Sequence, residues 1–176
     1  LKNNIEKYFD GSTINETEKR SVLHTALRSS EIKNPELKKE VETSIERITS
    51  ISDQINSGRK LGSTGKKIKD VVNIGIGGSH LGPDMVTEAL SYYSLSIKPH
   101  FVSNIDPDYT SKLLEKLDPE TTIFIIVSKT FTTIETLENA KKIRKWFVEN
   151  SDEESIKDHL IAVSNDTEAP KEVGIS

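Results

Sequence analysis

The sequence predicts an α/β fold: a three-layer α/β/α sandwich with a parallel, flavodoxin-like sheet, preceded by N-terminal helices. Two observations support this prediction. Short apolar runs rich in β-branched residues alternate with stretches in which apolar residues recur at helical spacing. Each apolar run also ends in Gly, Ser, Asn or Asp, as expected where parallel strands open into ligand-binding turns.

Residues 1–65 are predicted to form a helical segment that packs on the sheet domain. Within it, residues 15–28 are expected to be helical, with Thr17 as the cap. A longer amphipathic helix is expected to begin at Asn34-Pro35 and to end at Gly58, because Pro suits the first helical position and Gly favours a stop.

Residues 66–176 are predicted to form the sheet domain. Its strands are expected at residues 71–76, 100–103, 122–127 and 160–163, separated by helices. In the flavodoxin-like strand order, the first and third strands are neighbours where the order reverses. The turns that follow these two strands are therefore expected to face one crevice.

The turn after the third strand, residues 128–133, has the composition of an anion site. Its sequence is Ser-Lys-Thr-Phe-Thr-Thr, and a helix-like pattern follows at once. Hydroxyl groups would then lie beside the free N–H groups of a helix start, where the helix dipole also favours negative charge. The alternative is that these residues only cap the helix, since Thr132 and Glu135 fit a capping box.

The turn after the first strand, residues 77–83, is rich in glycine and includes Gly78 and Ser79. Neither dinucleotide-binding register fits, because His80 or Ser79 stands where a glycine is required. A nucleotide P-loop is also excluded, because Pro83 replaces the lysine that would follow Gly82. A small phosphorylated ligand remains, and a purely structural packing turn remains as the alternative.

Composition excludes several classes of protein. Cysteine is absent, so thiol catalysis and cysteine-bound metal are excluded. The net charge is −4 with basic residues scattered in short pairs, which argues against a nucleic-acid partner. No apolar run is long enough to cross a bilayer. We expect a cytoplasmic protein, and we expect the chain to be a fragment because it begins at Leu1 without Met.

Several segments together resemble the glucose-6-phosphate isomerase family. The resemblance runs along nearly the whole chain in the right order, from residues 22–28 and 64–66 through residues 71–79, 81–83, 101–106, 128–133 and 135–136. It implies a sugar isomerase (SIS) domain, the smaller of two in a longer polypeptide that works as a homodimer. It also implies interconversion of glucose 6-phosphate and fructose 6-phosphate through an enediol, without metal or organic cofactor.

By this resemblance, the substrate phosphate is held by the side chains of Ser128, Thr130 and Thr133 and by the Lys129 amide. Gly78 and Ser79 line the sugar side, and Thr132 serves chiefly as the helix cap. The family's general base and other catalytic groups lie further along the chain, so we expect no catalytic residue before Ser176 and no turnover by these 176 residues.

One residue departs from the family pattern. His80 stands where an aspartate most often follows the serine, which affects the expected hydrogen bonding of the glycine-rich turn. Two other functions stay open at this point. Isomerase-type domains also serve as non-catalytic sugar-phosphate sensors in regulators, and a nucleotide-binding domain is disfavoured by the failed glycine spacings.

Overall fold

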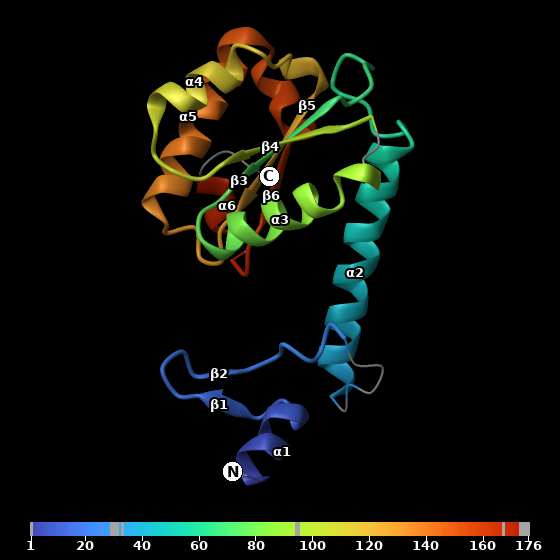
Figure 1. The fold of residues 1–176 in the computed structure, drawn as a ribbon, viewed down its shortest axis with the longest axis vertical. Coiled ribbons are helices and arrows are strands. Elements are labelled where there is room, and N and C mark those ends of the chain that lie inside the picture. Colours follow the sequence, from blue (N-terminus) through green and yellow to red (C-terminus); the bar gives the residue numbers. More distant parts are fainter. Residues whose placement is uncertain (1, 29–31, 33, 94–95, 167, 173–176) are drawn as a thin grey trace. The chain divides into compact units, whose positions relative to one another are not determined.

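The computed structural model describes residues 2–28, 32, 34–93, 96–166 and 168–172. It divides into two compact units, Leu1–Asp53 and Gln54–Ser176. The first unit holds helices and a short hairpin, and the second holds the parallel sheet and its helices (Figure 1). The division into segments 1–65 and 66–176 stays a prediction.

The helix expected over residues 15–28 is wrong. The first unit instead contains α1 (Lys2–Asp10) and an antiparallel hairpin of β1 (Thr13–Asn15) and β2 (Arg20–Ser21). The turn between these strands is stabilised by the Asn15 side chain, whose Oδ1 accepts from the Glu18 N–H at 3.0 Å. Lys19 adopts a left-handed φ of 51°. These local polar contacts favour a turn over the helix that apolar spacing predicted.

The long helix expected from Asn34 is confirmed as α2 (Pro35–Asn56). Asn34 caps it, because its Oδ1 accepts from the N–H groups of Glu36 at 3.0 Å and Leu37 at 3.2 Å. At the other end, Gly58 has a φ of 69° and its N–H donates to the Ile55 carbonyl at 3.0 Å. A left-handed residue of this kind is a common helix stop, and glycine adopts it without strain.

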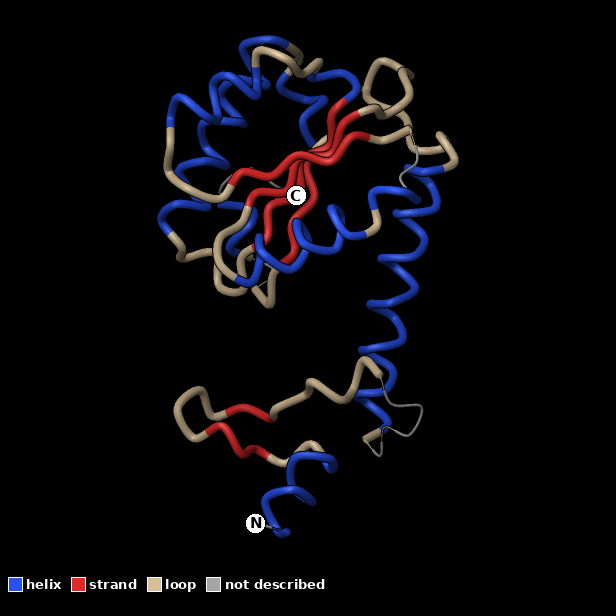
Figure 2. Tube along the Cα trace, in the orientation of Figure 1, coloured by secondary structure: helices blue, strands red, loops and turns tan. Residues whose placement is uncertain are grey.

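The second unit is built on a parallel sheet, whose strands are red in Figure 2. Their order in the sheet is β4-β3-β5-β6. The strands are β3 (Asp70–Ile74), β4 (Lys98–Val102), β5 (Thr122–Val127) and β6 (Leu160–Val163). The first and third of them, β3 and β5, are paired neighbours. The predicted α/β fold with a flavodoxin-like order is therefore confirmed.

Helices cover both faces of this sheet (Figure 1). α3 (Gly78–Ala89) lies on one face, and α4 (Pro107–Leu114) and α5 (Ile134–Asn150) lie on the other. Short elements complete the unit: α6 (Ala169–Glu172) and the 3₁₀ turns η1 (Ser91–Tyr93), η2 (Pro119–Thr121) and η3 (Glu153–Asp158).

The core lies between the sheet and α5. Strand residues Val72, Ile74, Val102 and Phe124 and helix residues Ile143 and Phe147 have no exposed surface. Burying an aliphatic or aromatic side chain of this kind stabilises the fold by about 1.5–3 kcal/mol. The carboxyl ends of the strands are thereby held in a fixed register, with Ile74 opposite both Val102 and Ile126.

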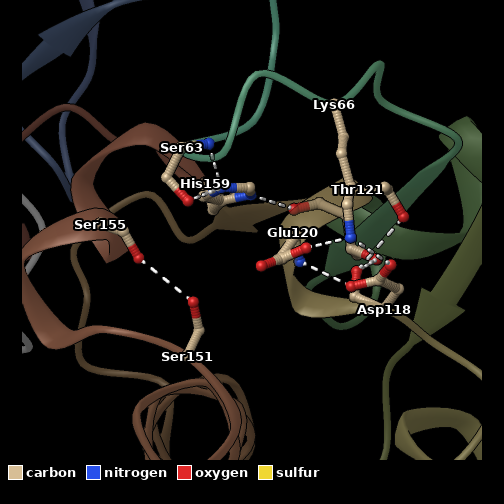
Figure 3. A network of polar contacts seen from close by, with 9 residues as sticks. Ser63, Lys66, Asp118, Glu120, Thr121, Ser151, Ser155 and His159 are labelled. Atoms are coloured by element: carbon tan, nitrogen blue, oxygen red, sulfur yellow. Dashed lines mark hydrogen bonds and ion pairs between the residues drawn. The ribbon is translucent and has the colours of Figure 1, made fainter.

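A buried histidine joins the amino end of the sheet to the turn that precedes β3 (Figure 3). His159 has no exposed surface, its Nδ1 lies 2.8 Å from the Thr122 carbonyl, and its Nε2 accepts from the Ser63 N–H at 3.0 Å. This pattern fixes the neutral tautomer with the proton on Nδ1. Close by, Lys66 binds Glu120, and this hydrogen bond is the main cause that raises the pKa of Lys66.

Candidate functional site

The two polar turns follow neighbouring strands, as the sequence predicted. β5 ends at Val127 and continues into the loop of residues 128–133, named the phosphate loop below after the ligand that the sequence predicts for it. β3 ends at Ile74, and α3 begins shortly afterwards at Gly78. Because β3 and β5 are parallel and paired, with Ile74 opposite Ile126, both connections leave the same edge of the sheet.

The first turn of α3 lies so close to the sheet that only glycine fits at residue 75. A Cβ atom there would lie 2.8 Å from the Ser79 Cβ and 3.1 Å from the Val127 carbonyl oxygen. Gly77, which precedes the helix, has a φ of 58°. The glycines at 75 and 77 thus have a structural role that brings the start of α3 to the end of β5.

The glycine-rich turn predicted over residues 77–83 is in fact mostly helix. α3 starts at Gly78 and contains Pro83. Pro83 has no N–H to donate to the carbonyl of Ser79, four residues earlier. The Asn73 side chain takes its place, since Nδ2 donates to the Ser79 carbonyl at 3.0 Å. Asn73 therefore fixes the helix turn that carries Ser79.

The phosphate loop is anchored by one buried ring and by two hydrogen bonds. Phe131 adopts a left-handed φ of 51° and is 5% exposed, packed in the core cluster. The Lys129 carbonyl accepts from Ser164 Oγ at 3.1 Å and from the Asn165 N–H at 3.1 Å. A non-glycine residue with positive φ persists only where surrounding contacts enforce it. The loop shape is thus set by the core and by the turn after β6.

The loop hydroxyls do not cap α5. The helix begins at Ile134 with Thr133 as the N-cap residue, and Thr133 makes no side-chain cap hydrogen bond. The predicted capping box of Thr132 and Glu135, and the role of Thr132 as the cap, are therefore wrong. Thr132 Oγ1 instead lies 2.7 Å from Thr130 Oγ1. Among the described residues, the loop hydroxyls thus make no cap hydrogen bond to the first N–H groups of α5, which lie next to them in the chain.

Two hydroxyls, one at the start of this loop and one just after it, are buried without partners among the described residues. Ser128 Oγ, directly after β5, belongs to a side chain that is 4% exposed, and Thr136 Oγ1, in the first turn of α5, to one that is 1% exposed. Leaving a buried hydroxyl unpaired costs about 1–3 kcal/mol. Such unpaired groups are expected where a polar ligand supplies the missing hydrogen bond. Thr136 was not among the predicted site residues.

His80 lies on α3, on the side of β4. Its ring packs edge-on against Phe101 with centroids 5.8 Å apart, its Nε2 lies 3.9 Å from Asp84 Oδ2, and its buried Nδ1 has no partner among the described residues. It also lines a pocket of about 500 Å³ together with Asn104, Asp106 and Tyr109. Asp106 caps α4 by accepting from the N–H groups of Asp108 and Tyr109. His80 thus packs beside β4 rather than in the phosphate loop.

Asn73, Phe131 and Ser164 support the candidate site, and sequence patterns did not identify them. Each acts through a tertiary contact with a backbone group or with the core, which periodicity does not reveal. In the part of the chain that the structure describes, no group of three or more His, Asp or Glu side chains could hold a metal ion. No helix among these residues is long and apolar enough to cross a membrane.

Known proteins match this chain along nearly its whole length. The phosphoglucose isomerase family profile matches residues 1–176. The chain belongs to the phosphoglucose isomerase family. It is 46% identical to a glucose-6-phosphate isomerase of Christiangramia forsetii and 50% identical to one of Helicobacter pylori, over 99% of this chain and 33% of each relative.

The crystal structure of a glucose-6-phosphate isomerase from Chlamydia trachomatis has the same fold. It matches with a TM-score of 0.76 and 28% identity, over 94% of this chain and 32% of that one. The chain therefore spans about a third of the length of the relatives that it matches. The resemblance expected from the sequence is confirmed.

Proposed function

We propose that this chain supplies the phosphate-binding part of a glucose-6-phosphate isomerase. The main support for this proposal is the position and composition of the phosphate loop. It lies beside the start of α3 at one edge of the sheet, and the buried Ser128 hydroxyl has no partner among the described residues. The relatives named above are glucose-6-phosphate isomerases, so glucose 6-phosphate and fructose 6-phosphate are the proposed substrates.

In this proposal the phosphate dianion is bound by hydrogen bonds rather than by a cluster of basic side chains. Ser128, Thr130, Thr132 and Thr133 offer hydroxyl donors, and the first turn of α5 offers N–H groups with partial positive charge. The Lys129 amide is included with them. Hydrogen bonds to a charged acceptor are stronger than neutral ones, which suits a small anion in a partly exposed loop.

Gly78 and Ser79 are proposed to contact the sugar part of the substrate. They form the first two positions of α3, next to the end of β5. The absence of a side chain at Gly78 leaves open space around this backbone, since a Cβ added there would meet no atom within 4 Å among the described residues. The Asn73 side chain donates to the Ser79 carbonyl, which holds the first turn of α3 in a fixed position for the sugar.

The wider activity is part of the same proposal. Isomerisation would proceed through an enediol with a carboxylate general base, and we propose that this base lies in the part of the relatives' length outside the match. Residues 66–176 would form an SIS-type domain, residues 1–65 would form its N-terminal segment, and the whole enzyme would be a cytoplasmic homodimer. These statements are supported by family membership.

The proposal is tested by titrating the chain with fructose 6-phosphate and with inorganic phosphate. The double variant Thr130→Ala/Thr133→Ala should bind both at least about tenfold more weakly, because each lost hydroxyl removes a charge-assisted hydrogen bond. Thr43→Ala/Thr49→Ala, on the exposed surface of α2, is the matched control and should bind as the unchanged chain does. Equal affinity of the two double variants would contradict the proposed site.

A further inference from the structure

The turn after β6 holds one peptide group of the phosphate loop in a fixed orientation. The Lys129 carbonyl accepts from Ser164 Oγ at 3.1 Å and from the Asn165 N–H at 3.1 Å. One step earlier along the loop, the Ser128 N–H donates to the Val163 carbonyl at 3.1 Å. The first residues of the loop are thus joined to β6 and its turn, so this peptide cannot rotate freely.

The orientation of this carbonyl determines the direction of the next N–H. In a trans peptide the C=O of residue 129 and the N–H of residue 130 point in opposite directions, and the described chain has no cis peptide. With the carbonyl directed at the turn after β6, the Thr130 N–H is directed away from β6. Because β5 lies between β6 and β3, that is the side on which Gly78 and Ser79 begin α3.

Further observations concern the groups around this N–H and around Ser164. Within the described residues, Thr130 N–H donates to no protein acceptor, and its own hydroxyl lies beside the Thr132 hydroxyl at 2.7 Å. Ser164 is itself held in place, because its Oγ also accepts from the Asp166 N–H at 3.0 Å. The Ser164 hydroxyl thus links the Asp166 N–H to the peptide between Lys129 and Thr130. The N–H of that peptide has no acceptor among the described residues.

We propose that Ser164 is a positioning residue for phosphate binding: by donating to the Lys129 carbonyl, it holds the Thr130 N–H toward the phosphate of the substrate. This inference rests on the proposed function. It adds a residue from the turn after β6 to a site that was predicted from the turns after β3 and β5. Ser164 acts through a backbone peptide and does not touch the ligand.

The test uses the full chain labelled with ¹⁵N and inorganic phosphate as the probe. Ser164→Ala should weaken phosphate binding by about three- to tenfold, the usual effect of one lost hydrogen bond, and should shift the Thr130 amide resonance even without phosphate. Ser164→Thr keeps the hydroxyl and should restore the affinity to within about twofold. Ser155→Ala is the matched control, because Ser155 Oγ likewise donates to a backbone carbonyl, that of Asp152, at 2.6 Å.

Several outcomes would overturn the positioning role. One is an affinity of Ser164→Ala equal to that of the unchanged chain, and another is a Ser164→Thr variant as weak as Ser164→Ala. The unchanged chain provides a test without any variant, since its Thr130 amide must respond when phosphate binds. Binding with a silent Thr130 amide would overturn this proposal alone, whereas no response from any loop amide would overturn the proposed function as well.

Discussion

At the scale of single residues, Ser128 and Phe131 show how the phosphate loop combines polar exposure with rigidity. Ser128 is buried yet has a hydroxyl without a partner among the described residues, which costs stability. Phe131 has a left-handed backbone, and the burial of its ring in the core offsets the steric cost of that conformation. A loop that must present hydrogen-bond donors to an anion benefits from such an anchor, because donors fixed in advance lose less entropy on binding.

Phe131 provides a test of this backbone strain. Phe131→Ala should destabilise the sheet unit by about 3–5 kcal/mol through loss of the buried ring. Phe131→Gly should be less destabilising than Phe131→Ala by about 1 kcal/mol, because glycine adopts a positive φ without the steric cost that alanine retains. Urea unfolding followed by the fluorescence of Trp146, whose ring lies 6.1 Å from that of Phe124, measures both values.

Phe147 is the matched control for this comparison. It has no exposed surface and lies inside α5, where glycine is less favourable than alanine by about 1 kcal/mol. The order of the two variants should therefore be reversed at Phe147, with Phe147→Gly the less stable. The same order at both positions would show that the Phe131 backbone is not strained.

At the scale of elements, the turn after β6 connects α6 to the phosphate loop. Asp166 accepts from the N–H groups of Ala169 at 3.0 Å and Glu168 at 2.8 Å. These two hydrogen bonds lower the pKa of the Asp166 carboxyl below its ordinary value. The Asp166 N–H in turn donates to Ser164 Oγ. The Asp166 carboxylate thus caps the start of α6, while its backbone N–H joins it to Ser164.

The lowered pKa of Asp166 gives a prediction with a definite sign. A carboxyl whose pKa is lower in the folded state stabilises that state at pH values above its unfolded pKa, and this contribution is lost as pH falls through the folded pKa. Asp166→Ala should therefore be less stable than the unchanged chain at pH 7. The difference should shrink in acid, below the ordinary carboxyl pKa of 3.8.

Urea midpoints of both proteins between pH 7 and pH 3 measure this difference. Asp152→Ala is a suitable control, because Asp152 is exposed and directly precedes η3, but its side chain makes no cap hydrogen bond. A difference between Asp166→Ala and the unchanged chain that grows in acid would contradict the assigned cap.

Sequence patterns predicted the elements whose burial dominates. The apolar run of β5 and the Pro and Gly that bound α2 fixed those elements correctly, because burial and backbone restriction act locally. The patterns failed where side chains bond to the backbone. Asn15 stabilises a hairpin turn where a helix was predicted. α3 begins at Gly78, within the predicted turn, and Asn73 supplies the hydrogen bond that Pro83 cannot make.

The candidate site followed the same rule. The edge of the sheet was predictable, because the strand order of this fold places the turns after β3 and β5 together. The capping box was not, since Thr133 rather than Thr132 precedes α5 and neither hydroxyl caps it. The supports from Ser164 and Phe131 depend on contacts with distant segments, which no local pattern encodes.

At the scale of the whole molecule, the phosphate loop forms part of a compact sheet unit, Gln54–Ser176, while the chain spans about a third of the relatives' length. The proposed function predicts that binding and turnover can be separated. We expect these 176 residues to bind sugar phosphate and to show no interconversion of glucose 6-phosphate and fructose 6-phosphate in a coupled assay. Measured turnover would contradict the proposal that the general base lies outside the match.

Linkage between binding and stability gives the most general test of the proposed ligand. A ligand that binds only the folded chain stabilises it by about 2.7 kcal/mol at a hundred times its Kd. For a unit of this size, that should raise Tm on the order of 10 °C. Fructose 6-phosphate should produce this shift in the unfolding of the sheet unit, followed by Trp146 fluorescence.

Three comparisons make the result specific. Glucose, which has no phosphate, should give no shift, and neither should fructose 6-phosphate with Thr130→Ala/Thr133→Ala at the same concentration. NAD and ATP should give smaller shifts, because the turn before α3 has neither the glycine spacing nor the lysine of a nucleotide loop. A larger shift with NAD or ATP than with fructose 6-phosphate would favour a nucleotide-binding role. A shift that needs the phosphate and the two threonines, and that is smaller with nucleotides, would identify the loop as a site for a sugar phosphate.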